Sequence, residues 1–275
     1  PTTPDVEALN EEFLAYLNHG GYPEAVFSRT VREDPQRYIK SDIIDKVLLR
    51  DLPGLYGVQD VQELNYLFTT LAFNTADELS LEELSKNSGV SKNTIKKYLE
   101  YLEAAFLIRL VHGVDRTARR FQRARRFKVY LTNTSIRSAL FAPVQADDPA
   151  MGGLVETAIF SQWFHRDETL HYARWKGGEV DLVKLRANQS VQWAVEAKWS
   201  DRFFKKPTEL KSLLAFCRSN RLQKALVTSR TQDGTRTLDE TELRFLPARL
   251  YCFIVGYWSI RGRRTSLGDT HGSLS

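Results

Sequence analysis

Residues 177–199 read GGEVDLVKLRANQSVQWAVEAKW, and this stretch decides the interpretation of the whole chain. Successive side chains of a strand point to opposite faces, so the pattern over 191–199 predicts a strand with two unlike faces. One face carries Glu196 and Lys198, which therefore point the same way. The other face carries the apolar residues Val191, Trp193, Val195, Ala197 and Trp199.

The segment before it is the predicted partner strand of a hairpin. It alternates so that Glu179 and Asp181 share one face, while Val180 and Leu182 share the other. If the two strands pair, Asp181 lies near the acid and the lysine of the second strand.

Two neighbouring carboxylates, Asp181 and Glu196, suggest a metal site. They do not ionise together readily unless a cation sits between them, and hard oxygen ligands suit Mg²⁺ or Mn²⁺. A lysine at position 198 could orient a water molecule or help to deprotonate it. The alternative is a solvated strand face, on which a Glu and a Lys two residues apart only keep the strand soluble.

A helix upstream adds a third acid. The segment MGGLVETAIFSQWFHRDE, residues 151–168, carries Glu156 with Phe160 and Trp163 four and seven residues later. This spacing places the carboxylate on the apolar stripe of the helix that faces the sheet. A carboxylate in such a place needs a partner.

A helix Glu, a hairpin Asp and a Glu-x-Lys in this order resemble the PD-(D/E)XK nuclease-like superfamily over residues 152–230. Glu156, Asp181, Glu196 and Lys198 match its motif residue by residue. The resemblance implies that Asp181 and Glu196 bind the divalent metal and that Lys198 assists the attacking water. It also implies that Glu156 supports the metal or a second ion, and inactive members that keep the fold are common.

The composition is that of a globular protein of two or three modules. The 275 residues include 39 Lys and Arg against 34 Asp and Glu, a net charge of +5 that hints at a polyanionic partner. Cys217 and Cys252 lie in apolar runs, which argues against a disulfide framework or a zinc site. With no signal peptide and no long apolar segment, we expect a cytoplasmic protein without a membrane association. The histidines His112, His165, His171 and His271 have no ligand spacing.

The first half of the chain is predicted to be helical and then to form a winged helix. Residues 1–60 contain two amphipathic helices around a turn at 19–24. Over 61–112, Ser80 and Ser91 are predicted to cap two helices that Gly89 separates, as in a helix-turn-helix. The inward residues of the second of these helices are Ile95, Tyr98, Leu99 and Leu102.

Basic residues on this module are the predicted DNA contacts. The second helix leaves Lys92, Asn93, Lys96 and Lys97 outward, where a helix-turn-helix presents base and phosphate contacts. The span 116–128 has no acid, and its high positive charge is better explained by contacts with phosphates than by solubility. The alternative for this run is a solvated wing, and the alternative for the helix-turn-helix is a protein-docking module. The seven cations of the run are Arg116, Arg119, Arg120, Arg123, Arg125, Arg126 and Lys128.

The order of motifs over residues 20–230 resembles the C-terminal half of a family of prokaryotic AAA+ ATPases. The motifs are GGYPEAV, YIKSDIIDKVLLRDL, LSLEELSKNSGVSKNTIKKYLEYLEAAFLI, FKVYLTNTSI, GGLVETAIFSQW, GGEVDLV and VEAKW. In such ATPases a P-loop module precedes a winged helix and a nuclease-like domain. This chain has no GxxxxGK[ST] motif, so we expect no ATP binding by that route. The expected partner is an ATPase module or a second copy of the chain. The chain also has Asn133 where the family tends to place an aspartate.

These features predict an α/β (α+β) protein with an N-terminal helical and winged-helix part and a restriction-endonuclease-like mixed sheet flanked by helices. The expected divisions are a lid-like helical segment 1–60, a winged helix 61–135, a nuclease-like domain 150–258 and a disordered tail 259–275. The expected function is DNA binding with metal-dependent phosphodiester hydrolysis. The alternative is a non-catalytic module of an ATPase that docks DNA or a protein and keeps a degenerate nuclease fold.

Overall fold

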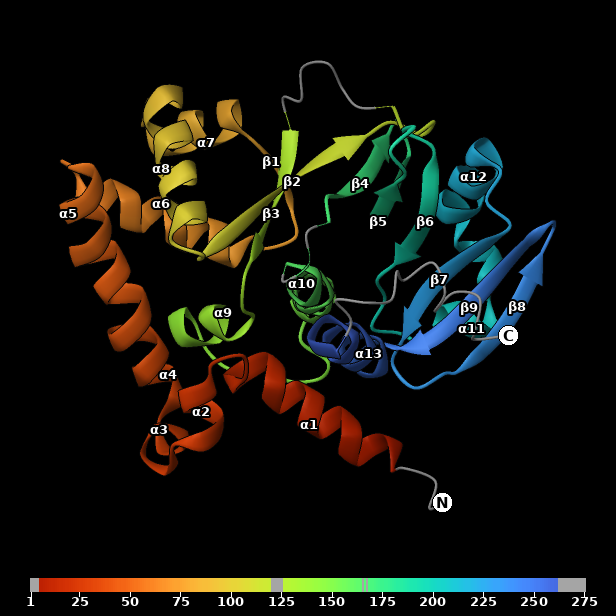
Figure 1. Cartoon of the computed structure of the whole chain (residues 1–275), viewed down its shortest axis with the longest axis horizontal. Coiled ribbons are helices and arrows are strands. Elements are labelled where there is room, and N and C mark those ends of the chain that lie inside the picture. The colour runs from red at the N-terminus through yellow and green to blue at the C-terminus, as the bar shows by residue number, and fades with distance from the viewer. Residues whose placement is uncertain (1–4, 120–125, 165, 167, 262–275) are drawn as a thin grey trace.

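The predicted hairpin lies at the centre of a mixed sheet in the computed structural model, which describes residues 5–119, 126–164, 166 and 168–261 (Figure 1). Among these residues the sheet has nine strands in the order β1-β3-β2-β4-β5-β6-β7-β9-β8. The strands are β1 (Glu78–Ser80), β2 (Ile108–Val114), β3 (Arg126–Leu131), β4 (Leu170–Trp175), β5 (Gly178–Leu185), β6 (Val191–Glu196), β7 (Lys224–Ser229), β8 (Gly234–Leu238) and β9 (Thr241–Pro247).

The sheet is mixed, and this confirms the predicted α+β class. Strands β6, β7 and β9 are parallel neighbours, whereas β4, β5 and β6 are antiparallel. Strand β2 joins the two parts of the sheet, because it pairs antiparallel with β3 and, over Gly113 and Val114, parallel with β4. The N-terminal half and the hairpin therefore belong to one continuous sheet.

Helices α6, α7 and α8 followed by β2 and β3 have the order of a winged helix. The hydroxyl of Ser80 accepts the Glu83 N–H (3.1 Å), and that of Ser91 accepts the Thr94 N–H (3.2 Å), which confirms both predicted caps. Gly89 ends α7 in the left-handed conformation, with φ +75°. The elements are α6 (Val61–Phe73), α7 (Leu81–Ser88) and α8 (Lys92–Ala104), and the predicted inward residues Ile95, Tyr98, Leu99 and Leu102 are buried.

The N-terminal segment is helical, as predicted. Phe13 and Leu17 of its first helix pack in the core around Leu154 and Val155, and residues 39–52 pack against the winged-helix core. Ile39, Ile44 and Leu48 are fully buried there, while Ile43 and Val47 are partly exposed. Hydrogen bonds of the π type run through part of this segment. The elements are α1 (Val6–His19), α2 (Pro23–Phe27), α3 (Arg29–Glu33), α4 (Pro35–Arg37), η1 (Tyr38–Ile44), η2 (Val47–Asp51) and α5 (Leu52–Tyr56).

Asn133 connects the turn after β3 to the N-terminal segment. Its side chain accepts the Ser135 N–H (3.0 Å) and donates to the Gly20 carbonyl (3.1 Å). The neighbouring Gly21 has φ +86°, and an added Cβ would lie 2.1 Å from the Asn133 amide nitrogen. The amide is therefore a structural link between segments that are more than a hundred residues apart.

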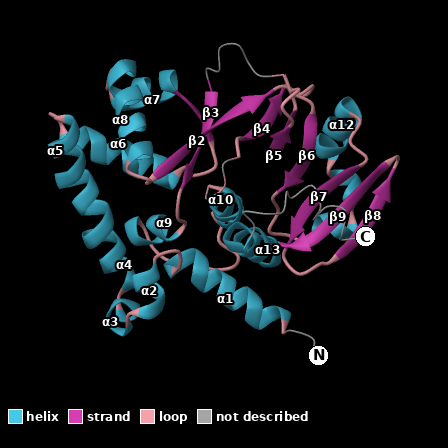
Figure 2. Ribbon diagram, in the orientation of Figure 1, coloured by secondary structure: helices cyan, strands magenta, loops and turns pink. Residues whose placement is uncertain are grey.

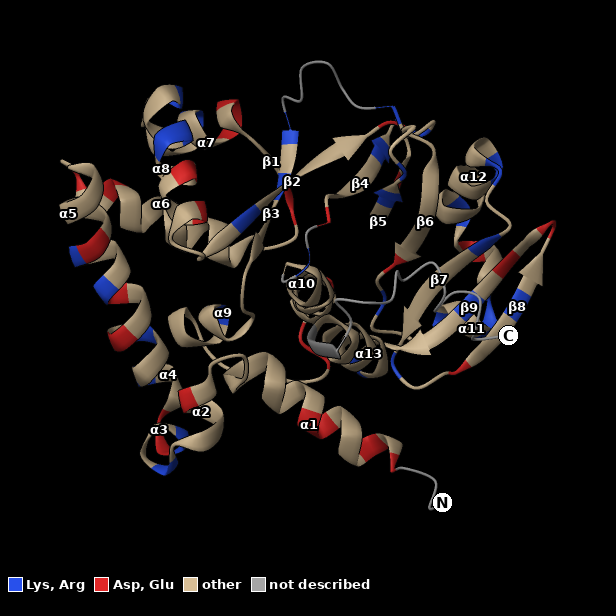
Figure 3. Cartoon of the chain, in the orientation of Figure 1, with Lys and Arg blue, Asp and Glu red and all other residues tan. Residues whose placement is uncertain are grey.

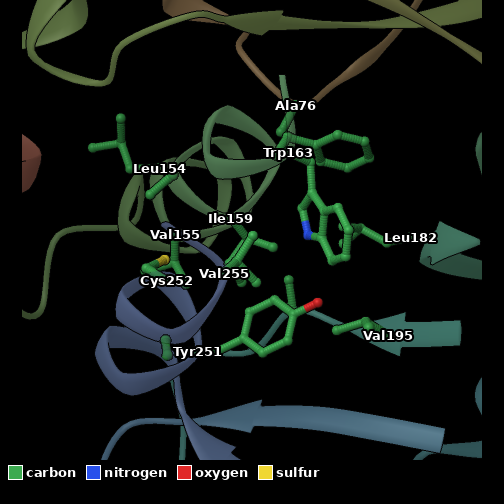
Figure 4. Close-up of a cluster of buried hydrophobic side chains, with 14 of the residues drawn as sticks. Ala76, Leu154, Val155, Ile159, Trp163, Leu182, Val195, Tyr251, Cys252 and Val255 are labelled. Carbon is green, nitrogen blue, oxygen red and sulfur yellow. The ribbon is translucent and has the colours of Figure 1, made fainter. Parts of the chain in front are cut away.

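Helices cover both faces of the central sheet (Figure 2). Helices α10 and α13 pack on one face, and α12 packs on the other. Phe160 and Trp163 of α10 are buried, as their spacing predicts, and the Trp163 and Trp193 rings lie 5.0 Å apart between centroids. Figure 4 shows Trp163 among the buried side chains of this core, which include Leu182 and Val195. The remaining helices are α9 (Ser135–Leu140), α10 (Met151–Trp163), α11 (Arg202–Lys205), η3 (Pro207–Glu209), α12 (Lys211–Asn220) and α13 (Ala248–Arg261).

The last apolar run, LRFLPARLYCFIV (residues 243–255), suggests a final strand, but only its first part is one. The strand β9 ends at Pro247, and helix α13 begins at the next residue. Buried side chains on one side of α13, such as Tyr251 and Val255, fill the space beside α10, and this packing favours the helix. The helix continues through Arg261, past the predicted start of the tail, and residues 262–275 lie outside the described part of the chain.

Two further expectations can be placed on the structure. Cys217 and Cys252 are both buried free thiols, one on each face of the sheet. Across the described ranges, no helix combines the length and the apolar composition that a membrane span requires.

Candidate functional site

Asp181, Glu196 and Lys198 converge at the ends of two central strands. Asp181 lies on β5, and Glu196 is the last residue of β6. The Lys198 ammonium is 2.8 Å from Glu196 Oε1 and 3.2 Å from Asp181 Oδ2. Both carboxylates are buried, with 6% and 7% of the residue exposed, so this is not the solvated strand face of the alternative interpretation. Lys198 itself lies two residues beyond the end of the strand on which we predicted it.

The predicted alternation is wrong on either side of Asp181. Val180 packs in the core beside α12, whereas Leu182 packs in the core beside α10. The pairing between β4 and β5 shifts here, because His171 faces Val183 but Ala173 faces Val180. Two residue steps along β4 thus correspond to three along β5. One extra residue on β5 forms a bulge, which turns successive side chains away from strict alternation.

A second shift separates Val191 from the apolar face to which we assigned it. Lys184 faces Trp193, but the next residue, Leu185, faces Val191. Val191 therefore packs with the core beside α12, while Trp193 and Val195 pack beside α10. Neither bulge is visible in the spacing of the sequence, because a bulge changes the register by a single residue.

Main-chain hydrogen bonds hold the Glu-x-Lys segment in place beyond the end of β6. Asp181 Oδ2 accepts the Ala197 N–H at 2.8 Å. The buried hydroxyl of Thr228, on β7, accepts the Lys198 N–H at 2.7 Å and donates to the Lys198 carbonyl at 2.9 Å. Thr228 thus fixes the backbone from which the Lys198 side chain starts, and no motif or spacing in the sequence marks this residue.

Glu156 has the partner that its buried position requires, and that partner is Lys128. Glu156 Oε1 accepts hydrogen bonds from the Lys128 ammonium at 2.8 Å and from the Tyr130 hydroxyl at 2.6 Å. Both donors come from β3, the second strand of the predicted wing. Lys128 also pairs with Glu179, and its ammonium lies 5.5 Å from the centre of the Tyr172 ring.

The basic run 116–128, predicted to neutralise phosphates, includes Lys128, but this residue does not lie on an exposed basic surface. Only 3% of this residue is exposed, and strand β3 turns it away from solvent. Phe127, Val129 and Leu131 face the winged-helix core, so Lys128 and Tyr130 lie on the opposite face, against α10. Alternation along β3 predicts that the apolar residues and the polar pair Lys128 and Tyr130 point to opposite faces. Only the fold shows that Glu156 lies against the polar pair.

The electrostatics of the cluster reflect crowded acids, the buried cation Lys128 and the partly exposed cation Lys198. Burial, together with the Asp181 carboxylate, raises the pKa of Glu196 from 4.5 to about 8. Burial raises the pKa of Glu156 to about 7, although Lys128 opposes this shift. For both lysines, burial lowers the pKa but the neighbouring carboxylates raise it more, so Lys128 and Lys198 have pKa values above the usual lysine value and stay protonated.

The cluster fits a divalent cation only through Asp181 and Glu196. Within the described residues, no group of three or more His, Cys, Asp or Glu side chains is close enough together to hold a metal ion. Glu196 Oε2, however, is buried and has no hydrogen-bond partner. A buried carboxylate oxygen without a donor is costly, and a cation beside it would satisfy it. Two carboxylates suffice for Mg²⁺, which keeps several waters and binds substrate phosphates.

The predicted DNA contacts on α8 are exposed. Lys92, Asn93, Lys96 and Lys97 all lie on its outer side, and Figure 3 shows the basic positions along this helix. Lys92 pairs with Glu82 at 3.0 Å, an exposed ion pair that a phosphate could replace at little cost.

The basic run is only partly described. Arg116 and Arg119 are exposed. Arg126 is half exposed and pairs with Glu78 and Glu83, so part of its charge is already neutralised within the protein. The predicted contacts Arg120, Arg123 and Arg125 lie outside the described residues.

Together the fold and the site define a mixed α/β protein with a helix-turn-helix part and a buried cluster of carboxylates and lysines. The chain belongs to the family of a domain of unknown function, DUF8612, whose model matches residues 10–148. This match includes Lys128 and Tyr130 but ends before Glu156.

Relatives add no assigned activity. The chain is 24% identical over 193 residues to an uncharacterized protein of Methanocaldococcus jannaschii, covering 66% of this chain and 42% of the relative. It is 23% identical over 186 residues to an uncharacterized protein of Haemophilus influenzae, covering 66% of this chain and 45% of the relative. The chain thus spans less than half the length of these curated relatives. No solved structure matches it at comparable significance.

Proposed function

We propose that this protein binds DNA and hydrolyses phosphodiester bonds with the help of Mg²⁺ or Mn²⁺. The observation that carries the proposal is the convergence of Asp181, Glu196 and Lys198, with one oxygen of Glu196 buried and without a partner. A buried cluster of this kind is unfavourable for stability by itself, so a functional role is the better explanation.

Each residue of the cluster has a distinct role in this proposal. Asp181 and Glu196 hold the divalent ion, which when bound polarises the scissile phosphate and lowers the pKa of a bound water. Lys198 remains protonated, so its ammonium donates hydrogen bonds that place the attacking water and offsets the negative charge of the transition state. Thr228 keeps the Lys198 backbone in position through its two hydrogen bonds.

DNA binding in this proposal uses α8 and the basic run. The exposed lysines of α8 lie on a helix that follows a capped turn, and such a helix presents its outer face to phosphates and bases. Arg116 and Arg119 extend the positive surface. Phosphate contacts of this kind do not depend on the metal, so binding and cleavage should be separable.

The test is cleavage of plasmid and oligonucleotide DNA with Mg²⁺, Mn²⁺ or a chelator, by the wild type, Asp181→Asn and Lys198→Met. Asp181→Asn keeps the shape of the side chain and removes one ligand charge. We expect metal-dependent cleavage by the wild type alone and nearly unchanged DNA binding by both variants. Cleavage that persists in Asp181→Asn would indicate a contaminating nuclease, and no cleavage by the wild type with either metal would refute the catalytic proposal.

One observation favours the non-catalytic alternative. Glu156, which would support a metal in the nuclease-like superfamily, is bound instead by Lys128 and Tyr130. In this second proposal the site is a degenerate remnant, and the protein docks DNA or a protein. Tight DNA binding without cleavage, equal in the presence of metal and of chelator, would support it.

The partner and the location are further proposals. The curated relatives are more than twice as long as the matched region, which leaves room in them for another module. We propose that an AAA+ ATPase module or a second copy of the chain is the partner, as the motif order over residues 20–230 suggests. The two buried free cysteines are compatible with a reducing cytoplasm.

A further inference from the structure

Lys128 is a fixed cation inside the acidic site. Its strand, β3, lies between β1 and β2, and Lys128 is opposite Glu78 on one side and Val111 on the other. The backbone is therefore held by ladders on both sides, and 3% of the residue is exposed. The ammonium contacts Glu156 and Glu179 and lies 5.5 Å from the centre of the Tyr172 ring, so three side chains hold it in place.

The two lysines divide the carboxylates of the cluster between them. Lys198 contacts Asp181 and Glu196, and Lys128 contacts Glu156 and Glu179. Each ammonium thus lies against two carboxylates, which is the charge environment that attracts a divalent cation. The two groups differ in one respect. Glu196 has a buried oxygen without a partner, whereas Glu156 Oε1 accepts from both Lys128 and Tyr130.

We propose that Lys128 occupies the place that a second divalent cation would take between Glu156 and Glu179. The site then accepts one metal ion, at Asp181 and Glu196, and strand β3 of the helix-turn-helix part supplies its second positive charge. The first ion, at Asp181 and Glu196, belongs to the proposed metal-dependent function, and that part of the inference rests on it. The replacement of Lys128 by a second ion does not rest on that function.

A divalent cation can replace the Lys128 ammonium because both bring positive charge to the same carboxylates. Removing one partner of a buried ion pair leaves the other charge uncompensated, and this strongly destabilises the fold. After Lys128→Met, which keeps a similar length without the charge, the buried Glu156 would lose its cation, while Glu179 would keep its ion pair with Arg174. A divalent cation with water ligands can satisfy the two carboxylates in place of the ammonium.

The experiment counts Mn²⁺ ions bound per chain by electron paramagnetic resonance of the free ion, with thermal unfolding followed in parallel. We expect one bound ion in the wild type and two in Lys128→Met. The double variant Lys128→Met/Glu156→Gln lacks both members of the Lys128–Glu156 ion pair and should again bind one ion. Tyr130→Phe is the matched control, because it removes a neutral donor to the same Glu156 oxygen and should still bind one ion. Mn²⁺ should raise the unfolding temperature of Lys128→Met more than that of the wild type.

The outcomes separate this inference from the proposed function. If Lys128→Met binds no more Mn²⁺ than the wild type, the inference is refuted while a single ion in the wild type leaves the proposed function standing. If the wild type binds no ion but Lys128→Met gains one, the inference stands and the proposed metal-dependent function fails. If Lys128→Met does not fold even with Mn²⁺, the metal does not replace the ammonium, and the inference is again refuted.

Discussion

Thr228 holds the main chain of Lys198 from both sides. Its buried hydroxyl accepts the Lys198 N–H at 2.7 Å and donates to the carbonyl of the same residue at 2.9 Å. Because β6 has already ended at Glu196, these hydrogen bonds replace part of the strand ladder. The direction of the Lys198 side chain therefore depends on a residue thirty positions later in the chain.

Replacing Thr228 by valine should both destabilise the protein and impair the site. The change leaves the N–H and the carbonyl of Lys198 without partners, at a cost of about 1–3 kcal/mol per buried group. Cleavage should slow more than DNA binding weakens, because the lysine loses its position while the phosphate contacts remain. Urea unfolding and single-turnover cleavage measure the two effects.

Thr228→Ser is the control for this change, since it keeps the hydroxyl. It should retain most of the stability and cleavage of the wild type. A Thr228→Val variant as active as Thr228→Ser would show that the hydroxyl does not position Lys198.

Stability should fall as the pH rises from about 5 to about 8. Glu196 has a pKa of about 8 in the folded protein against 4.5 in the unfolded chain, so the folded state binds more protons in this interval. The stabilising contribution is complete below pH 4.5 and is lost as the pH rises through the folded pKa. Glu156, with a pKa of about 7, changes stability in the same direction.

The measurement is the free energy of unfolding in urea over a series of pH values without divalent metal. The free energy of unfolding of Glu196→Gln should fall less over this pH range, because the amide does not ionise. The remaining fall should come from Glu156. A wild-type stability that is constant or rises over this interval would contradict the buried, crowded state of the two acids.

Neutralising the lysines of α8 should weaken DNA binding in a salt-dependent way. In the triple variant Lys92→Met, Lys96→Met, Lys97→Met, the slope of log affinity against log salt concentration should become shallower by about one per lysine that contacts a phosphate. Fluorescence anisotropy with a labelled duplex at several salt concentrations gives the slope.

A second triple variant controls for the loss of net charge. Lys40, Lys205 and Lys206 are also exposed but lie away from α8 in the sequence, and their replacement by Met should change the slope much less. Equal effects of the two triple variants would mean that the charge of the whole molecule, and not α8, determines binding.

Leu182→Ala should test the core beside α10. Leu182 is fully buried against this helix, so its truncation should cost about 2–5 kcal/mol of unfolding free energy. Leu55→Ala is the matched control, because Leu55 is 76% exposed and the same truncation should have little effect. Similar losses in both variants would contradict the assignment of Leu182 to the core.

The sequence alone was sufficient wherever short-range periodicity and capping decide the structure. Ser80 and Ser91 cap their helices because the hydroxyl of an N-cap serine is within reach of the orphan N–H three residues later. Phe160 and Trp163 are buried because their spacing puts them on one stripe of a helix. Asp181 and Glu196 meet because they come from adjacent strands of one hairpin, a contact that requires only local pairing, whereas Lys198 lies beyond the end of β6 and also needs Thr228.

Only the tertiary structure decided what lies against these local elements. The bulge beside Asp181 arises from the pairing with β4, so alternation within β5 could not separate Val180 from Leu182. The apolar run after Pro247 became a helix because α10 offers a surface that suits one. Lys128 is a buried partner of Glu156, twenty-eight residues away, because β3 and α10 pack together. Strand periodicity can say which way a side chain points, but packing determines which charge it meets there.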